Sequence, residues 1–238
     1  MLRTVVVLSC LLSSVAWAAP SSFSAAKKNL AKLYQNELPM ESLYCGCRFT
    51  DSAKGKKVKL VPALASCGYQ SRVEKKKGKY YQRAHRIEWE HVMPAYDFGR
   101  QLQCWQQGGR KNCRKDKTFK AMEADMHNLY PAIGEVNGDR SNYRLTDWNG
   151  RADQYGQCQM VVDFKRKQAQ PPKRARGQVA RSYLYMAQRY QIRLSKAQRK
   201  LYSSWHTMYP ATPSECQRHR LVSQKQGQIN PFTAQQCS

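Results

Sequence analysis

The chain has 238 residues, in which 41 Lys and Arg against 16 Asp and Glu give a formal net charge of +25. Self-repulsion of that size destabilises a compact protein, so we expect a polyanionic partner such as DNA, RNA or another anionic surface. Beyond the N-terminal segment no apolar run approaches the length that a bilayer requires, which argues against a membrane-spanning protein. The length suffices for one well-buried domain.

The first eighteen residues have the pattern of a cleaved secretory signal. Arg3 supplies the positive charge, residues 4–15 are largely apolar, and Ala16-Trp17-Ala18 fits a signal-peptidase site. An uncleaved N-terminal anchor is the alternative. We therefore expect export to the periplasm or the medium, a mature chain that begins at Ala19, and a single domain over residues 19–238.

Removal of that segment takes away Cys10 and leaves eight cysteines, an even number that predicts four disulfides in an oxidising compartment. Short loops favour two pairings, Cys104–Cys113 and Cys216–Cys237. The other four cysteines would pair as Cys47–Cys67 and Cys45–Cys158, or the converse. A zinc site at Cys45-x-Cys47 is the alternative, but no second pair follows at zinc-finger spacing.

In chain order, helical spacing of apolar residues first predicts a helix over Phe23–Asn36. Residues 45–74 are expected to be irregular and strand-rich, and residues 75–79 to form an exposed basic turn. The next segment, residues 80–93, has aromatic and β-branched residues that predict an extended conformation, which Pro94 would end.

The second half of the chain is expected to be mostly helical. Helices are predicted from Pro94 to Gln107, from about Asp116 to His127, briefly after Ile133, over 178–191 and over 195–208. Residues 168–176 contain Pro171-Pro172 and are expected to be a surface connection. The predicted fold class is α+β, a single mixed domain with more helix than strand and with disulfide staples.

His91 has the neighbourhood best suited to chemistry, because Glu90 precedes it. A neutral imidazole can take a proton from water near pH 7, and a carboxylate can hold a hard cation such as Mg²⁺. The dipeptide alone is common. A zinc-peptidase site is disfavoured, because His-Glu-x-x-His does not occur and Trp89 stands where the reversed pattern needs its second histidine.

A second informative stretch runs from Met126 to Tyr143 and is dense in amides, glycine and charge. The side-chain carbonyl of Asn137 is a hard oxygen donor that can bind Mg²⁺ or Ca²⁺ without adding negative charge. Asn128 is a second amide nearby. From composition alone, helix caps and turns are the competing interpretation of these amides.

Taken together, four motifs occur in order. They are Glu90-His91-Val92-Met93-Pro94, Gln103-Cys104-Trp105 with Gly109-Arg110-Lys111-Asn112-Cys113, His127-Asn128-Leu129-x-Pro131, and Gly134-Glu135-Val136-Asn137-x-x-Arg140-Ser141-Asn142. This set closely resembles the bacterial endonuclease I family, exported and disulfide-containing nucleases of the His-Me finger (ββα-metal) group. The resemblance is densest over residues 80–143 and extends to nearly the whole mature chain.

The resemblance implies a ββα-metal catalytic core at about residues 80–143. It implies that His91 is the general base, that Glu90 and Asn137 hold one metal ion, and that Arg110 steadies the cleaved phosphate. Mg²⁺ is the expected cofactor, with Mn²⁺ or Ca²⁺ as substitutes, and the products would carry 5′-phosphates. In a regular strand, however, Glu90 and His91 point to opposite faces, so a bend is expected there.

Two basic clusters are candidate contacts for nucleic-acid phosphates: Lys75, Lys76 and Lys77 in the turn, and Lys173, Arg174 and Arg176 further on. Phosphate contacts give affinity without sequence information. We therefore expect a monomeric, sequence-indifferent endonuclease that hydrolyses double- and single-stranded DNA, with RNA as a side substrate. An exported polyanion-binding protein without turnover is the alternative, but it leaves Glu90, His91 and Asn137 without a purpose.

Overall fold

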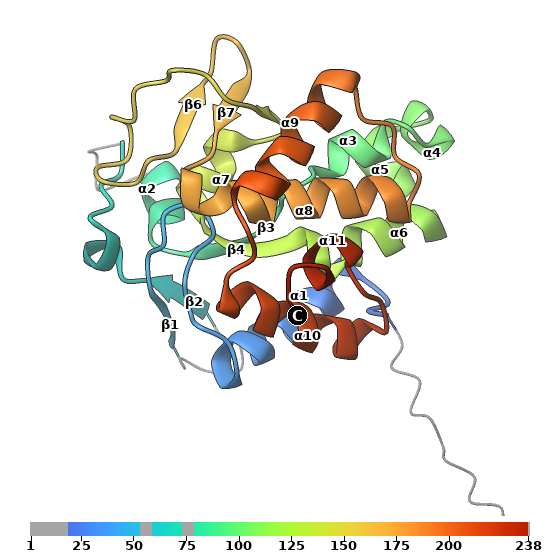
Figure 1. The fold of residues 1–238 in the computed structure, drawn as a ribbon, viewed down its shortest axis with the longest axis horizontal. Helices are drawn as coiled ribbons and strands as arrows, with labels where there is room; N and C mark the ends of the chain where they lie inside the picture. The colour runs from blue at the N-terminus through green and yellow to red at the C-terminus, as the bar shows by residue number, and fades with distance from the viewer. Residues whose placement is uncertain (1–18, 53–58, 73–78, 238) are drawn as a thin grey trace, which may run out of the picture.

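The structure, a computed structural model, describes residues 19–52, 59–72 and 79–237 (Figure 1). The expected signal segment and the predicted phosphate contacts Lys75, Lys76 and Lys77 lie outside these ranges. The described chain folds into a mixed α/β domain with more helix than strand, as the sequence predicts. Within the described ranges, every helix is too short or too polar to span a bilayer.

Helices make up most of the domain. The helices are α1 (Phe23–Asn36), α2 (Lys79–Ala84), α3 (Ala95–Gly99), α4 (Gln103–Gln106), α5 (Gly109–Cys113), α6 (Lys117–Ala124), α7 (Gly134–Arg140), α8 (Lys173–Arg189), α9 (Lys196–Met208), α10 (Pro213–Gln226) and α11 (Pro231–Ala234), with 3₁₀ turns at Leu64–Cys67 and Met126–Asn128. Helix α8 is buried along most of its length and packs closely against α9. Its burial on several sides makes α8 the centre of the helical part.

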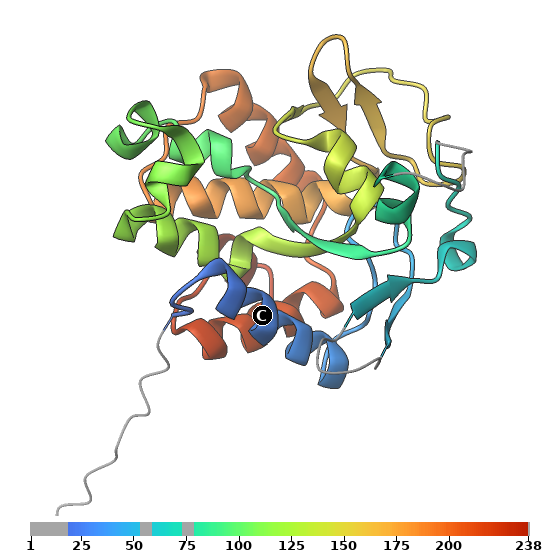
Figure 2. The same ribbon diagram turned by 180° about the vertical axis from the view of Figure 1, so that it is seen from behind.

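The strands form three small sheets. Strands β1 (Phe49–Ser52) and β2 (Lys59–Pro62) pair antiparallel, as do β3 (Ile87–His91) and β4 (Leu129–Ile133), and a third sheet has the order β5-β7-β6 from Arg144–Leu145, Gln168–Gln170 and Val161–Asp163. Figure 2 shows β3 and β4 side by side, crossing in front of α8, with α1 below them. Every residue of β4 is buried, so this pair is a fixed support for the residues that β3 carries.

Four disulfides staple the described chain, in the first of the two arrangements that the sequence allows. The pairs are Cys45–Cys158, Cys47–Cys67, Cys104–Cys113 and Cys216–Cys237. The first joins residues 113 positions apart and ties the N-terminal third to the segment between β5 and β6. The last attaches the residues after α11 to α10, in the pairing predicted from the sequence.

Several local predictions were wrong. The segment 80–93 is extended only over β3, because its first half forms α2, which packs against α7; such packing overrides the strand preference of Tyr80 and Tyr81. The expected surface connection 168–176 contains β7 and the first turn of α8, which begins directly after Pro172. Helix α10 was not predicted from the sequence. Thr212 caps its N-terminus, and Pro213 is its first residue.

Candidate active site

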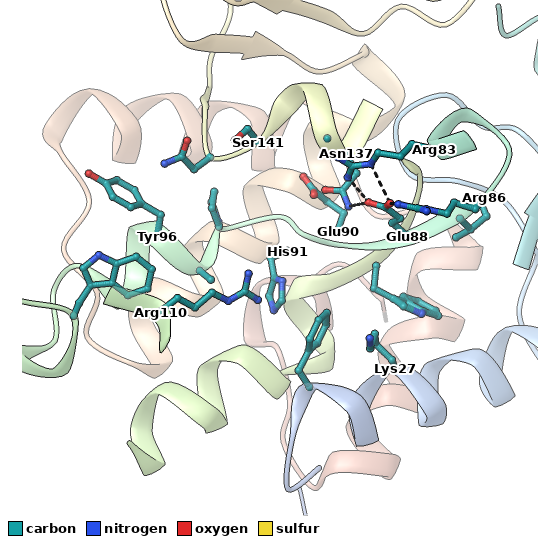
Figure 3. Close-up of a pocket in the computed structure, with 18 residues that line it drawn as sticks. Lys27, Arg83, Arg86, Glu88, Glu90, His91, Tyr96, Arg110, Asn137 and Ser141 are labelled. Atoms are coloured by element: carbon teal, nitrogen blue, oxygen red, sulfur yellow. Dashed lines mark hydrogen bonds and ion pairs between the residues drawn. The ribbon is translucent and has the colours of Figure 1, made fainter. Parts of the chain in front are cut away.

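A pocket of about 820 Å³ lies beside β3, bounded by α1, α7 and the segment from α3 to α5. All four residues that the sequence analysis selected for chemistry line it: Glu90, His91, Arg110 and Asn137 (Figure 3). They come from three separate stretches of the chain. The fold therefore brings the sequence-predicted residues together in one place.

Strand β3 supplies the centre of the pocket. It stays regular up to His91, which faces Leu129 across the β3–β4 pair. Alternation places Glu88 and Glu90 on one face of the strand and His91 on the other. The bend expected between Glu90 and His91 is absent from the pairing with β4, which includes both residues, yet both residues line the same pocket.

Arg140 fixes the end of β3 against α7. Its guanidinium is fully buried and donates from Nη1 to Glu90 Oε1 at 2.7 Å and to the carbonyl of His91 at 2.9 Å, and from Nη2 to the carbonyl of Val92 at 2.7 Å. Asn137 lies one turn earlier on α7 and faces the same strand. A buried, charge-assisted set of bonds thus sets the distance between Asn137 and β3.

Glu88 is surrounded by donors at the α7 end of the pocket. Its carboxylate accepts hydrogen bonds from the guanidiniums of Arg83 and Arg86 and, at Oε2, from Asn137 Nδ2 at 2.9 Å. The backbone of Gly134 passes so close that a Cβ there would lie 3.0 Å from the Glu88 carboxyl carbon. Glycine therefore allows the close approach of α7 to Glu88, and Asn137 turns its amide oxygen away from that carboxylate.

His91 is held in one orientation by its neighbours. Its Nε2 is 2.9 Å from the carbonyl of Glu123, and only a protonated Nε2 can donate to a carbonyl. The Phe23 ring packs on the imidazole with 4.6 Å between centroids. Burial lowers the pKa of His91 to about 4, against the opposing effect of the Glu123 hydrogen bond. At neutral pH the imidazole is therefore uncharged, with its lone pair on Nδ1, to which no described residue donates.

Arg110 reaches the pocket from α5, on the opposite side of His91 from Asn137 (Figure 3). Its Nε and Nη2 both donate to Glu123 Oε1, at 2.9 and 2.6 Å. Glu123 therefore holds two pocket residues, Arg110 through its carboxylate and His91 through its carbonyl. The Arg110 side chain is 42% exposed, so part of the guanidinium remains open to a ligand.

The oxygen atoms at the α7 end suit a hard cation. Glu90 accepts from Tyr44 and Arg140 at Oε1 only, and among the described residues none donates to its Oε2 or to Asn137 Oδ1. Burial raises the pKa of Glu90, and Arg140 and Tyr44 oppose that rise. The described residues contain no group of three His, Cys, Asp or Glu arranged around a metal. A carboxylate and an amide oxygen nonetheless match the habit of Mg²⁺, which keeps several waters and binds few protein ligands.

The second predicted basic cluster lies away from this pocket. Arg176 is buried and forms an ion pair with Asp147 at 2.7 Å, and Arg174 donates to Glu41 and to two backbone carbonyls. Lys173 is exposed. The contacts of Arg174 and Arg176 are structural, so a role for them in nucleic-acid binding stays a prediction without support from their surroundings.

Several residues that line the pocket were not predicted from the sequence. They are Phe23, Lys27, Arg83, Arg86, Glu88, Tyr96 and Trp105. Glu88 had a usable signal, because period-two alternation places it on the same strand face as Glu90. Lys27 and Phe23 are one helical turn apart on α1, but no sequence pattern indicates that this helix approaches His91.

The model of the protein family described as Endonuclease I matches residues 22–237. An extracellular deoxyribonuclease of Aeromonas hydrophila is 56% identical over 217 residues, which cover 91% of this chain and 89% of that protein. A periplasmic deoxyribonuclease of the same species is 54% identical and covers 91% and 86%. Endonuclease-1 of Buchnera aphidicola subsp. Acyrthosiphon pisum (strain APS) is 46% identical and covers 91% and 82%.

Proposed function

The chain belongs to the endonuclease I family, and from this membership we propose that it is an exported endodeoxyribonuclease that hydrolyses DNA without regard to sequence. The observation that carries the proposal is the convergence of Glu90, His91, Arg110 and Asn137 on one pocket. A polyanion-binding protein without turnover would need the net charge of +25 but not this convergence. We propose that β3, β4 and α7 form the ββα-metal core that the resemblance to the family implies.

His91 is the general base in this proposal. Its Nε2–H donates to the Glu123 carbonyl, which leaves Nδ1 to take the proton of an attacking water. The pKa of about 4 keeps the imidazole neutral at the pH of an oxidising, near-neutral compartment. Phe23 packs on the ring and restricts its rotation. This orientation prepares the base before substrate arrives.

Glu90 Oε2 and Asn137 Oδ1 are the protein oxygens that would hold Mg²⁺, with Mn²⁺ or Ca²⁺ as substitutes. When bound, the ion supplies a Lewis acid that neutralises charge on the phosphate. Arg140 holds Glu90, and Glu88 directs the Asn137 amide, so both oxygens are positioned by contacts with other residues.

Arg110 binds the phosphate opposite the metal ligands. Its guanidinium offers donors in a fork that fits two phosphate oxygens, and Glu123 sets its direction. Charge develops on the phosphate oxygens as water attacks, and a fixed donor pair stabilises that charge. We propose products with a 5′-phosphate and a 3′-hydroxyl, as the resemblance to the family implies.

The net positive charge and the expected export lead to proposals for the substrates of the enzyme and for the compartment in which it acts. Contacts to the sugar-phosphate backbone would accept double- and single-stranded DNA alike, with RNA as a side substrate. We propose that residues 1–18 are removed on export, that the enzyme acts in the periplasm or the medium, and that it is a monomer.

Plasmid nicking tests the proposal. The purified, oxidised protein is incubated with supercoiled plasmid and Mg²⁺, with or without EDTA, beside His91→Ala and the control His85→Gln, whose histidine is exposed and does not line the pocket. We expect EDTA to stop nicking and His91→Ala to slow it about 10²–10⁴-fold. Nicking that persists in EDTA, or that His91→Ala leaves unchanged, contradicts the mechanism; binding without nicking by the wild type contradicts the function.

A further inference from the structure

The end of the pocket opposite Glu88 and Asn137 is aromatic. The described residues leave four large hydrophobic side chains exposed, and of these only Tyr96, at 41%, lines the pocket. Figure 3 shows Tyr96 at the far end, with His91 and Arg110 between it and Asn137. Tyr96 therefore offers an aromatic surface, with a polar hydroxyl, on the wall of a polar pocket.

Tyr96 and Trp105 form a corner. Their ring centroids are 5.9 Å apart and their planes are nearly perpendicular, at 78°. Trp105 lines the same pocket. A flat group that stacks on one of two perpendicular rings meets the other ring with its edge, so the corner accepts a planar ligand in one orientation.

The corner is rigid on its protein side. A Cβ at Gly99 would lie 2.2 Å from Trp105 Cε3, so the indole packs directly on the α3 backbone. Phe119 supports the indole at 6.0 Å between centroids, and the Cys104–Cys113 disulfide begins one residue before Trp105. Arg100 lies over Tyr96 with its guanidinium carbon 5.4 Å from the ring centroid. Little ordering is left to occur when a ligand binds.

The size and charge of the pocket indicate which planar ligand fits. A volume of about 820 Å³ exceeds what a phosphate and its ion need and lies in the range of sites that enclose a whole organic ligand. Arg100 and Arg110 flank the corner with positive charge. A planar ring attached to an anionic backbone satisfies both features, and nucleobases stack on aromatic side chains in this way whatever their identity.

We propose that Tyr96 and Trp105 form a nucleobase subsite, which takes the base of a nucleotide adjacent to the scissile phosphate when that base is unpaired. The inference rests on the proposed nuclease function and adds a preference within it. In a duplex each base is stacked and paired, so the subsite contributes only where the strand is single or has opened. Cleavage of single strands therefore gains from the corner and cleavage of intact duplex does not.

The test uses short single-stranded oligonucleotides with one cleavable phosphodiester among methylphosphonate linkages. One version has all its bases, and two others carry an abasic site on the 5′ or the 3′ side of that bond. The mature, oxidised wild type is compared with Tyr96→Ala and Tyr96→Phe, and with Phe164→Ala as matched control. Phe164 is also 41% exposed but does not line the pocket.

We expect Tyr96→Ala to lower kcat/KM on the full oligonucleotide about tenfold, and Tyr96→Phe and Phe164→Ala to keep it within about twofold. For the wild type, kcat/KM should be about tenfold lower on one of the two abasic substrates than on the full oligonucleotide. For Tyr96→Ala, kcat/KM on that abasic substrate should equal its value on the full oligonucleotide. On duplex DNA the loss of kcat/KM in Tyr96→Ala should be much smaller than on the single strand.

The subsite would be overturned if Tyr96→Ala lowered kcat/KM equally on the full and the abasic substrates, or lowered it on neither. If Tyr96→Ala fails to fold, as circular dichroism would report, the two abasic substrates with the wild type still decide the matter. Failure of the wild type to cut any of these substrates or plasmid DNA would instead refute the nuclease function itself.

Discussion

The side-chain amide of Asn137 donates its Nδ2–H to Glu88 Oε2 at 2.9 Å. An amide has a donor end and an acceptor end, so this bond also decides where Oδ1 points. The Glu88 carboxylate is at the same time occupied by Arg83 and Arg86, which stops it from competing as a cation ligand. In the proposed metal site, Glu88 is therefore a positioning residue that orients Asn137 without touching the metal.

Replacement of Glu88 by Ala is expected to weaken metal binding about tenfold, because residues that orient metal ligands contribute on that scale. Binding of Mn²⁺ followed by electron paramagnetic resonance measures this without catalysis. Glu88→Gln can still accept from Asn137 and should lose less. In an Asn137→Ala background, Glu88→Ala should have no further effect on affinity, whereas independent losses would contradict the coupling. Asp147→Ala, which removes an arginine-paired carboxylate outside the pocket, is the control.

Substitution of Arg110 by Lys should lower kcat about 10²-fold, with a smaller change in KM, because a lysine keeps the charge but loses the fork of donors. Steady-state kinetics on a defined oligonucleotide separates the two parameters. Arg114→Lys is the matched control, since Arg114 directly follows α5, is exposed and does not line the pocket. If both substitutions lowered kcat equally, Arg110 would contribute only general positive charge and not a specific contact with the phosphate.

The position of helix α1 was predicted from the sequence, because Ala26, Leu30, Leu33 and Tyr34 recur at helical spacing and are all buried. The predicted cap was Ser24, whereas Ser22 caps the helix. The segment of α2 was wrongly predicted to be extended, because its tyrosines favour strand. It packs against α7 as a helix. A local sequence pattern predicts an element correctly where one face of that element packs on the core. It fails where contacts with a part of the chain distant in sequence determine the secondary structure.

For the pocket, short motifs located the residues for which we propose direct chemical roles, since each motif is contiguous in the chain. The residues that orient them are dispersed. Arg140 binds Glu90 from 50 positions away and Tyr44 reaches it from 46 positions away on the other side. His127 Nε2 lies 2.9 Å from the carbonyl of Gln228, 101 positions away. Such long-range pairings depend on the fold and leave no local signal.

Removal of the Cys104–Cys113 disulfide should lower activity more than its small loop suggests. The bridge spans nine positions, and that loop contains Trp105 and Arg110, both in the pocket. A Cys104→Ser, Cys113→Ser double variant should lose about 2–3 kcal/mol of unfolding free energy by the loop-entropy relation. Cleavage at a temperature where the variant is fully folded should still fall, because Arg110 loses its fixed direction.

The matched control for that experiment is the Cys216→Ser, Cys237→Ser variant, whose bridge closes a loop of 21 positions in the tail. It should cost similar stability and leave kcat unchanged. If both double variants lower kcat alike, the effect reports overall loosening and the special role of the short bridge is refuted.

Acid should destabilise the protein through His127. Burial lowers its pKa to about 4, with Asp125 opposing the shift and Arg218 and His219 adding to it. The unfolded histidine titrates near 6.5, so between the two values the unfolded chain binds more protons than the folded one. The stability that the neutral imidazole contributes is therefore complete above pH 6.5, decreases as the pH falls, and is lost by about pH 4.

Urea unfolding at pH 7.5, 5.5 and 4.5 measures this loss, which amounts to at most about 3 kcal/mol for His127. His127→Gln can still donate to Gln228 and should show a smaller fall in unfolding free energy than the wild type over that range. His91 has a similarly lowered pKa and adds to the same window, so the comparison between variant and wild type isolates His127. His85→Gln, at an exposed position, should keep the wild-type slope. Identical slopes for His127→Gln and the wild type would show that another group carries the acid sensitivity.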